Sequence, residues 1–146
     1  MRKLTIQRKK SFVACLGKFK VYAEDSSGEL TIRDVPCRKL GELKNGAEET
    51  FLISERAQKI FVIADQASKE YCNDFVKVPA GSNDVSYTGQ CRFNPTNGNA
   101  FRFDDVTDEE VLANRKAAGK RGGFITVLSI FIGFLVGFVL VQLMLK

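Results

Sequence analysis

The residues of this chain that could do chemistry are four isolated cysteines and several runs of adjacent acids. There is no histidine, so the commonest acid/base group and metal ligand is missing. The cysteines are Cys15, Cys37, Cys72 and Cys91. They are too far apart in the sequence to form the closely spaced pairs of zinc and redox motifs. Phosphate-binding, nucleophile-elbow and metalloprotease motifs are also absent. We therefore expect no catalytic residue, no cofactor and no metal site.

Ordinary structural roles account for these residues. Neighbouring acids such as Glu48-Glu49 and Asp104-Asp105 point to opposite faces of a strand or are solvated beside a turn. The thiols suit small buried apolar positions, because disulfides are disfavoured in a cytoplasmic domain. If the domain lay outside the cytoplasm, two disulfides would become plausible.

The strongest signal is an uncharged stretch, residues 124–145, with the sequence FITVLSIFIGFLVGFVLVQLML. A bilayer core of about 30 Å needs about 20 apolar helical residues. A buried core helix would rarely run so long without a polar face. The stretch therefore predicts a transmembrane helix, which makes the lipid bilayer the first expected partner.

Basic residues set the expected orientation. Four precede the span, namely Arg115, Lys116, Lys120 and Arg121, and only Lys146 follows it. Basic flanks favour the cytoplasmic side, and the N-terminus lacks the apolar run of a signal peptide. We expect a single-pass, tail-anchored protein whose N-terminal domain is cytoplasmic.

Three small residues recur every fourth position within the span: Ser129, Gly133 and Gly137. They share one helix face, where small side chains let two helices approach closely. The spacing indicates helix–helix contact with a protein partner or with a second copy as a homodimer. The alternative is that glycine is simply common in membrane helices.

Residues 1–105 predict an all-β domain, an antiparallel β-sandwich or small barrel, because short strands alternate with turn signals. The expected strands are residues 4–8, 18–24, 29–32, 37–43, 50–53, 59–64, 75–78, 85–87, 91–93 and 100–103. Residues 59–64 should be a central strand buried on both faces. Asn45-Gly46 indicates a hairpin turn.

Alternation within strands predicts which side chains face inward. Phe19, Val21 and Ala23 should point into the core. Phe101 and Phe103 should do the same while Arg102 points outward, which we prefer to an Arg/aromatic interaction surface with Arg92 and Phe93.

Residues 106–123 read as a linker with a short helix over 108–118. Thr107 and Glu110 fit a capping box. Glycines should then interrupt the helix and leave a flexible joint: Gly119, Gly122 and Gly123.

The first twenty residues are basic and contain no acid: Arg2, Lys3, Arg8, Lys9, Lys10, Lys18 and Lys20. They could touch anionic lipid headgroups, and nucleic acid binding is unlikely but open. The preferred interpretation is the solvated face of a strand and its turn.

A family pattern runs through residues 3–64: a basic first strand, Ser11-Phe12-Val13, Phe19-Lys20-Val21-Tyr22, and a strand that leads into LKNG (residues 43–46) and a β-rich strand from Phe51. This resembles small PEGA-like β-sandwich domains of bacterial proteins. The resemblance implies a binding or spacer module without known catalytic residues. No site residue can be carried over, and segments 25–38 and 65–105 are longer than in the short form.

Two functions follow from these patterns. The first is a membrane-tethered binding or scaffolding module at the cytoplasmic face, and the second is an accessory subunit of a larger membrane complex. An enzyme with an unrecognised site is the least favoured alternative, because the usual site constellations are missing.

Overall fold

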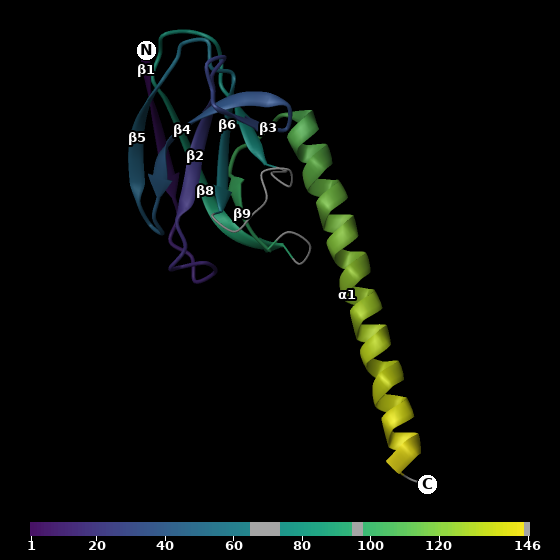
Figure 1. Cartoon of the computed structure of the whole chain (residues 1–146). Coiled ribbons are helices and arrows are strands. Elements are labelled where there is room, and N and C mark those ends of the chain that lie inside the picture. Colours follow the sequence, from purple (N-terminus) through teal and green to yellow (C-terminus); the bar gives the residue numbers. More distant parts are fainter. Residues whose placement is uncertain (65–73, 95–97, 145–146) are drawn as a thin grey trace.

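The chain forms a β-sandwich followed by one long helix (Figure 1). The structure is a computed structural model and describes residues 1–64, 74–94 and 98–144. Its elements are β1 (Arg2–Arg8), β2 (Phe19–Glu24), β3 (Leu30–Ile32), β4 (Val35–Leu43), β5 (Glu48–Ile53), β6 (Lys59–Ala64), β7 (Phe75–Lys77), β8 (Val85–Asn94), β9 (Gly98–Phe103) and α1 (Glu109–Met144). The predicted all-β sandwich with a C-terminal helix is confirmed.

Two sheets make up the sandwich. The four-stranded sheet has the order β5-β1-β8-β9, and the five-stranded sheet has the order β3-β4-β2-β6-β7. Neighbouring strands are antiparallel except β1 and β8, which run parallel with Ile6 opposite Tyr87. A register shift interrupts the β2–β4 pairing between Val21 and Tyr22.

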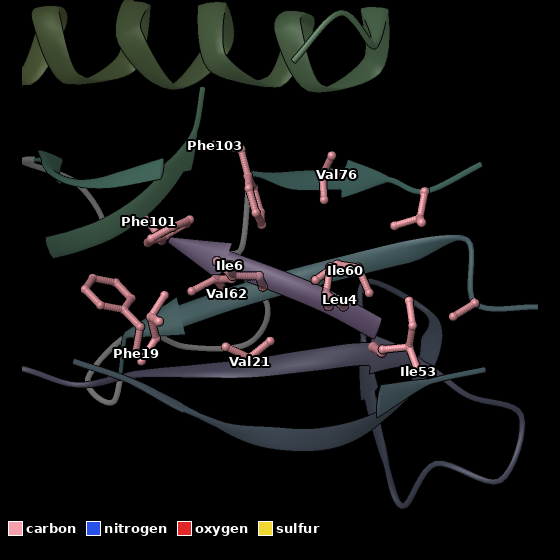
Figure 2. Close-up of a cluster of buried hydrophobic side chains, with 14 of the residues drawn as sticks. Leu4, Ile6, Phe19, Val21, Ile53, Ile60, Val62, Val76, Phe101 and Phe103 are labelled. Atoms are coloured by element: carbon pink, nitrogen blue, oxygen red, sulfur yellow. The ribbon is translucent and has the colours of Figure 1, made fainter. Parts of the chain in front are cut away.

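The main core lies between the two sheets, and Figure 2 shows side chains from both sheets meeting there. Phe19, Val21 and Ala23 are buried as predicted. Phe101 and Phe103 are buried while Arg102 is exposed, so the predicted alternation of β9 is confirmed. Edge-to-face contacts join Phe101 to Phe19 and to Phe103, with ring centroids 5.6 Å and 5.1 Å apart.

A second apolar cluster covers the other face of the five-stranded sheet. Its buried members come from strands β2, β3, β4, β6 and β7 and from the first turn of α1: Tyr22, Ile32, Cys37, Phe61, Ile63, Phe75 and Val111. Strand β6 is therefore buried on both faces, as its continuous apolar run predicted. The cluster also places the start of the helix against the domain.

Two local predictions about strands are wrong. Gly46 does have a positive φ of 74°, but the Asn45-Gly46 turn links β4 in one sheet to β5 in the other instead of closing a hairpin. Strand β5 pairs with β1, and the Asn45 side chain bonds to the backbone of Ser11.

The segments 85–87 and 91–93 form the single strand β8 and are not two short strands. Gly89, between them, does not break the strand. A Cβ there would lie 2.5 Å from the Phe101 ring and 2.6 Å from the Arg102 carbonyl oxygen. Glycine is therefore needed for close approach of β9.

Candidate functional site

The candidate site is the long helix α1 together with the exposed surfaces of the β domain. Its segment Gly123–Met144 is long and apolar enough to cross a bilayer, judged by length and composition. The side chains of this segment lie outside the β domain and are exposed. The chain thus combines a β domain with an apolar helix that suits membrane association.

The expected linker helix and apolar helix are both present, and they form one continuous element. The predicted interruption at Gly119, Gly122 and Gly123 is wrong. Each glycine costs a helix about 1 kcal/mol relative to alanine, and the alanines and basic residues around these positions are good helix formers. Helical structure therefore runs from the domain into the apolar segment without a joint.

The helix is capped by Asp108, one residue later than predicted. Its carboxylate accepts hydrogen bonds from the backbone N–H groups of Glu110, at 3.1 Å, and Val111, at 3.3 Å. The proposed capping box of Thr107 and Glu110 is therefore wrong. Asp108 also binds Lys77 Nζ on β7 at 2.7 Å, so the cap is tied to the five-stranded sheet. The Lys77 hydrogen bond is the main reason why the pKa of Asp108 is lowered.

A buried ion pair clamps the next turn of α1 to the domain. The Arg115 guanidinium donates to both carboxylate oxygens of Asp74, at 2.8 to 3.1 Å, and to the carbonyl oxygen of Phe103 at 2.6 Å. Both side chains are largely buried. Burial raises the pKa of the Asp74 carboxyl above its ordinary value, and the bonds from Arg115 oppose that shift. The clamp fixes the direction in which the apolar segment leaves the domain.

Arg115 was predicted as a basic residue of the membrane flank, and its side chain is occupied by this clamp. Lys116 and Lys120 are exposed on α1. Arg121 lies in the helix, and its side chain is outside the described part of the structure. The role of these four residues beside a membrane stays a prediction.

The three predicted contact residues of the span lie on α1 at a spacing of four. Ser129 Oγ donates to the Ile125 carbonyl oxygen at 2.9 Å, a bond within the helix. A Cβ built on Gly133 or Gly137 would meet nothing within 4 Å. Within the described chain, these two glycines therefore face open space.

The sequence did not indicate that the basic first strand holds buried arginines. Arg2 and Arg8 are buried, so a solvated face is the wrong interpretation for these two. Arg8 donates to the carbonyl oxygens of Ala14 and Gly17, both at 2.7 Å, and of Leu43 at 3.3 Å. Its guanidinium also lies 4.5 Å from the centre of the Phe19 ring. The folded loop and the end of β4 supply these partners, and the sequence alone does not show that the chain folds to bring them around Arg8.

The loop that Arg8 holds presents apolar side chains to solvent. Residues 9–18 join β1 to β2, and Phe12 and Leu16 on this loop are 95% and 97% exposed. Ala14 adopts a positive φ of 51°, and the Gly17 N–H donates to its carbonyl oxygen. The loop is therefore ordered by hydrogen bonds, and it exposes two large apolar side chains to solvent.

An open depression of about 660 Å³ lies beside the start of α1. Arg33 and Asp34, at the turn between β3 and β4, both have positive φ. Arg33 and Lys59 lie 5.6 Å and 5.3 Å from the centre of the Phe75 ring, and Arg33 lies 3.8 Å from Glu110. The cations thus pack against an aromatic ring and a carboxylate of the same chain.

The cysteines occupy different environments. Cys37 and Cys91 are buried, as expected for small apolar side chains, and burial raises the pKa of Cys37 to about 11. Cys15 is exposed on the loop of residues 9–18, which the sequence did not predict. Cys72 lies outside the described residues.

Comparisons of this chain with models of known protein families and with curated proteins find no match. The resemblance to PEGA-like domains over residues 3–64 therefore stays a prediction.

Proposed function

We propose that this chain is a membrane-anchored binding or scaffolding module whose β domain is held at the cytoplasmic face by a single-pass helix. The observation that carries the proposal is the continuous helix α1, which is clamped to the domain at Arg115 and is apolar from Gly123 to Met144. The orientation is supported by the basic residues before the span, among them the exposed Lys116 and Lys120.

Binding, rather than catalysis, is the role we propose for the β domain. The sequence has no histidine, and the described surface of the domain includes an apolar loop and an open depression lined by two basic and two acidic side chains. The resemblance to PEGA-like modules supports the same role.

The proposed contact within the membrane is a homodimer through Ser129, Gly133 and Gly137. The open face at the two glycines supports close approach of a second helix. An accessory subunit of a larger complex would use the same face against a different helix, so the size of the native particle separates the two functions.

The test is gentle solubilisation of native membranes followed by sizing of the particle. A homodimer-sized particle would contradict the accessory subunit, and a large stable complex would contradict the homodimer. Gly133→Leu with Gly137→Leu should reduce the dimer to a monomer, because two large side chains would separate the helices. Leu135→Phe adds bulk on the opposite side of the helix and should leave the dimer intact.

A further inference from the structure

We infer that the loop of residues 9–18 is a second membrane contact, which inserts Phe12 and Leu16 into the interfacial region of an anionic bilayer beside α1. The inference rests on the proposed membrane anchoring and goes beyond it. It assigns a lipid surface, and not the helix alone, as a partner of the β domain.

The first observation is the exposure of the loop. Phe12 and Leu16 are almost completely exposed, while the loop that carries them is held at its base by Arg8. The Asn45 side chain accepts a hydrogen bond from the Ser11 N–H and donates one to the Ser11 carbonyl oxygen. Scattered apolar residues on a surface are ordinary, but two at full exposure on one bonded loop mark an interaction site. The order of the loop reduces the conformational entropy that insertion would cost.

The second observation is the position of the loop relative to the apolar segment of α1. Figure 1 shows the loop between β1 and β2 at the end of the sandwich toward which the helix runs. From Glu109 to Gly123 the helix rises about 21 Å at about 1.5 Å per residue. Strand β1 and α1 both begin at the opposite end of the sandwich (Figure 1), and from Arg2 to Arg8 the strand extends about 20 Å at about 3.3 Å per residue. The apolar segment therefore begins close to the level of the loop.

The third observation is that α1 and the domain are joined rigidly. Val111 is fully buried in the second apolar cluster, and Arg115 binds Asp74 and Phe103. A helix inserted in a bilayer would thus carry the loop to the same bilayer. This continuity is why we assign the loop to lipid and not to a soluble protein.

The charges around the loop suit an anionic surface. Lys10 and Lys44 are exposed, and neither is in an ion pair with any described residue. The side chain of Lys10 packs near Gly46, so both lysines lie at this end of the sandwich. Lys9 and Lys18 are already paired, with Asp104 at 2.7 Å and Glu42 at 3.5 Å. The cytoplasmic leaflet is anionic and attracts unpaired basic residues held next to it.

The experiment uses the absence of tryptophan from this sequence. The full chain with Leu16→Trp is reconstituted into vesicles of phosphatidylcholine and phosphatidylserine, with and without bromine on the acyl chains. We expect its emission to shift to shorter wavelength and to be quenched by the brominated lipid. Adding Lys10→Glu and Lys44→Glu should lower this quenching, because the attraction to phosphatidylserine becomes repulsion.

Two control variants make the outcome decisive. Phe134→Trp lies in the apolar segment and should be quenched if the helix is inserted, while Leu52→Trp, exposed on β5 opposite Lys3, should not be. If Phe134→Trp is quenched and Leu16→Trp is quenched no more than Leu52→Trp, the loop lies in water and the lipid contact is wrong. If Phe134→Trp itself is not quenched, the proposed anchoring is wrong and the loop contact falls with it.

Discussion

At the scale of single residues, the guanidinium of Arg8 is buried where β1 ends and donates to three backbone carbonyl oxygens. Two of these carbonyls, from Ala14 and Gly17, belong to the loop of residues 9–18, and the third, from Leu43, ends β4. Burial lowers the pKa of Arg8, but a guanidinium stays charged at neutral pH. Arg8 therefore closes the base of the loop and joins it to the neighbouring sheet.

Replacing Arg8 should destabilise the domain. A hydrogen bond to a charged group contributes about 1.5–3 kcal/mol, and unbonded buried carbonyls carry a further cost. We expect Arg8→Gln to lower the free energy of unfolding by about 3 kcal/mol. The measurement is urea unfolding of the full chain in detergent micelles, followed by circular dichroism. The exposed Arg56→Gln is the matched control and should change stability by less than about 0.5 kcal/mol. Equal effects of the two variants would contradict this role for Arg8.

The cap of α1 should depend on pH through Asp108. Bonds from Lys77 and from the backbone N–H groups of Glu110 and Val111 hold the pKa of Asp108 below its ordinary value. A group with a lowered pKa in the folded state adds stability above its unfolded pKa, about 3.9 for aspartate. That stability is lost as the pH falls through the folded pKa. Asp108→Asn should therefore be less stable than the natural chain at neutral pH, and the difference should shrink in acid. A difference that persists unchanged in acid, measured by the same unfolding assay, would show that the carboxylate charge is unimportant.

The residue scale also shows a limit of sequence reasoning. Alternation correctly placed Phe19, Phe101 and Phe103 in the core, because burial follows from the period of a strand. It could not place Arg8, because the partners of that side chain come from residues 14, 17 and 43. The burial of this polar side chain depends on how the loop folds back and on where β4 ends, and strand periodicity reports neither.

At the scale of elements, the strands were predictable and their connections were not. Turn signals located most strands, but the Asn45-Gly46 signal reports only the local backbone conformation. It does not report which sheet receives the next strand, and β5 pairs with β1 because long-range packing decides that choice. The helix shows the same limit. Glycine lowers helix propensity at Gly119, but the helix continues through it.

The clamp between α1 and the domain should be sensitive to one substitution. Arg115→Gln would leave the Asp74 carboxylate in a largely buried site without its bidentate partner. Breaking a buried ion pair costs about 3 kcal/mol or more. We expect faster amide hydrogen exchange at residues 109–116, because the first turns of the helix would detach from the domain. The control is Lys116→Gln, which changes the exposed residue next to Arg115 and should leave amide hydrogen exchange unchanged. Protection that survives Arg115→Gln would assign the docking of the helix to Val111 and the second apolar cluster alone.

At the scale of the whole molecule, the apolar segment was the easiest feature to predict and its coupling to the domain the hardest. Length and absence of charge located this apolar helical segment directly. The sequence suggested a flexible linker, whereas the structure has a capped, clamped and continuous helix. Asp74 and Arg115 are 41 residues apart in the chain, so only the folded domain reveals their contact. Because the connection is rigid, the direction of the helix determines how the β domain is oriented relative to it.

The orientation of the whole molecule is the last prediction. Leu52 is exposed on β5, so Leu52→Cys, with Cys15→Ser and Cys72→Ser, gives an accessible thiol on the domain. We expect an impermeant maleimide to leave this thiol unlabelled in intact cells and to label it after lysis, because basic flanks favour the cytoplasmic side, where we propose that the domain lies. The buried Cys37 and Cys91 should react only after denaturation, as expected for thiols whose pKa burial raises, and so provide an internal control. Labelling of Leu52→Cys in intact cells would place the domain outside the cytoplasm and overturn the proposed orientation.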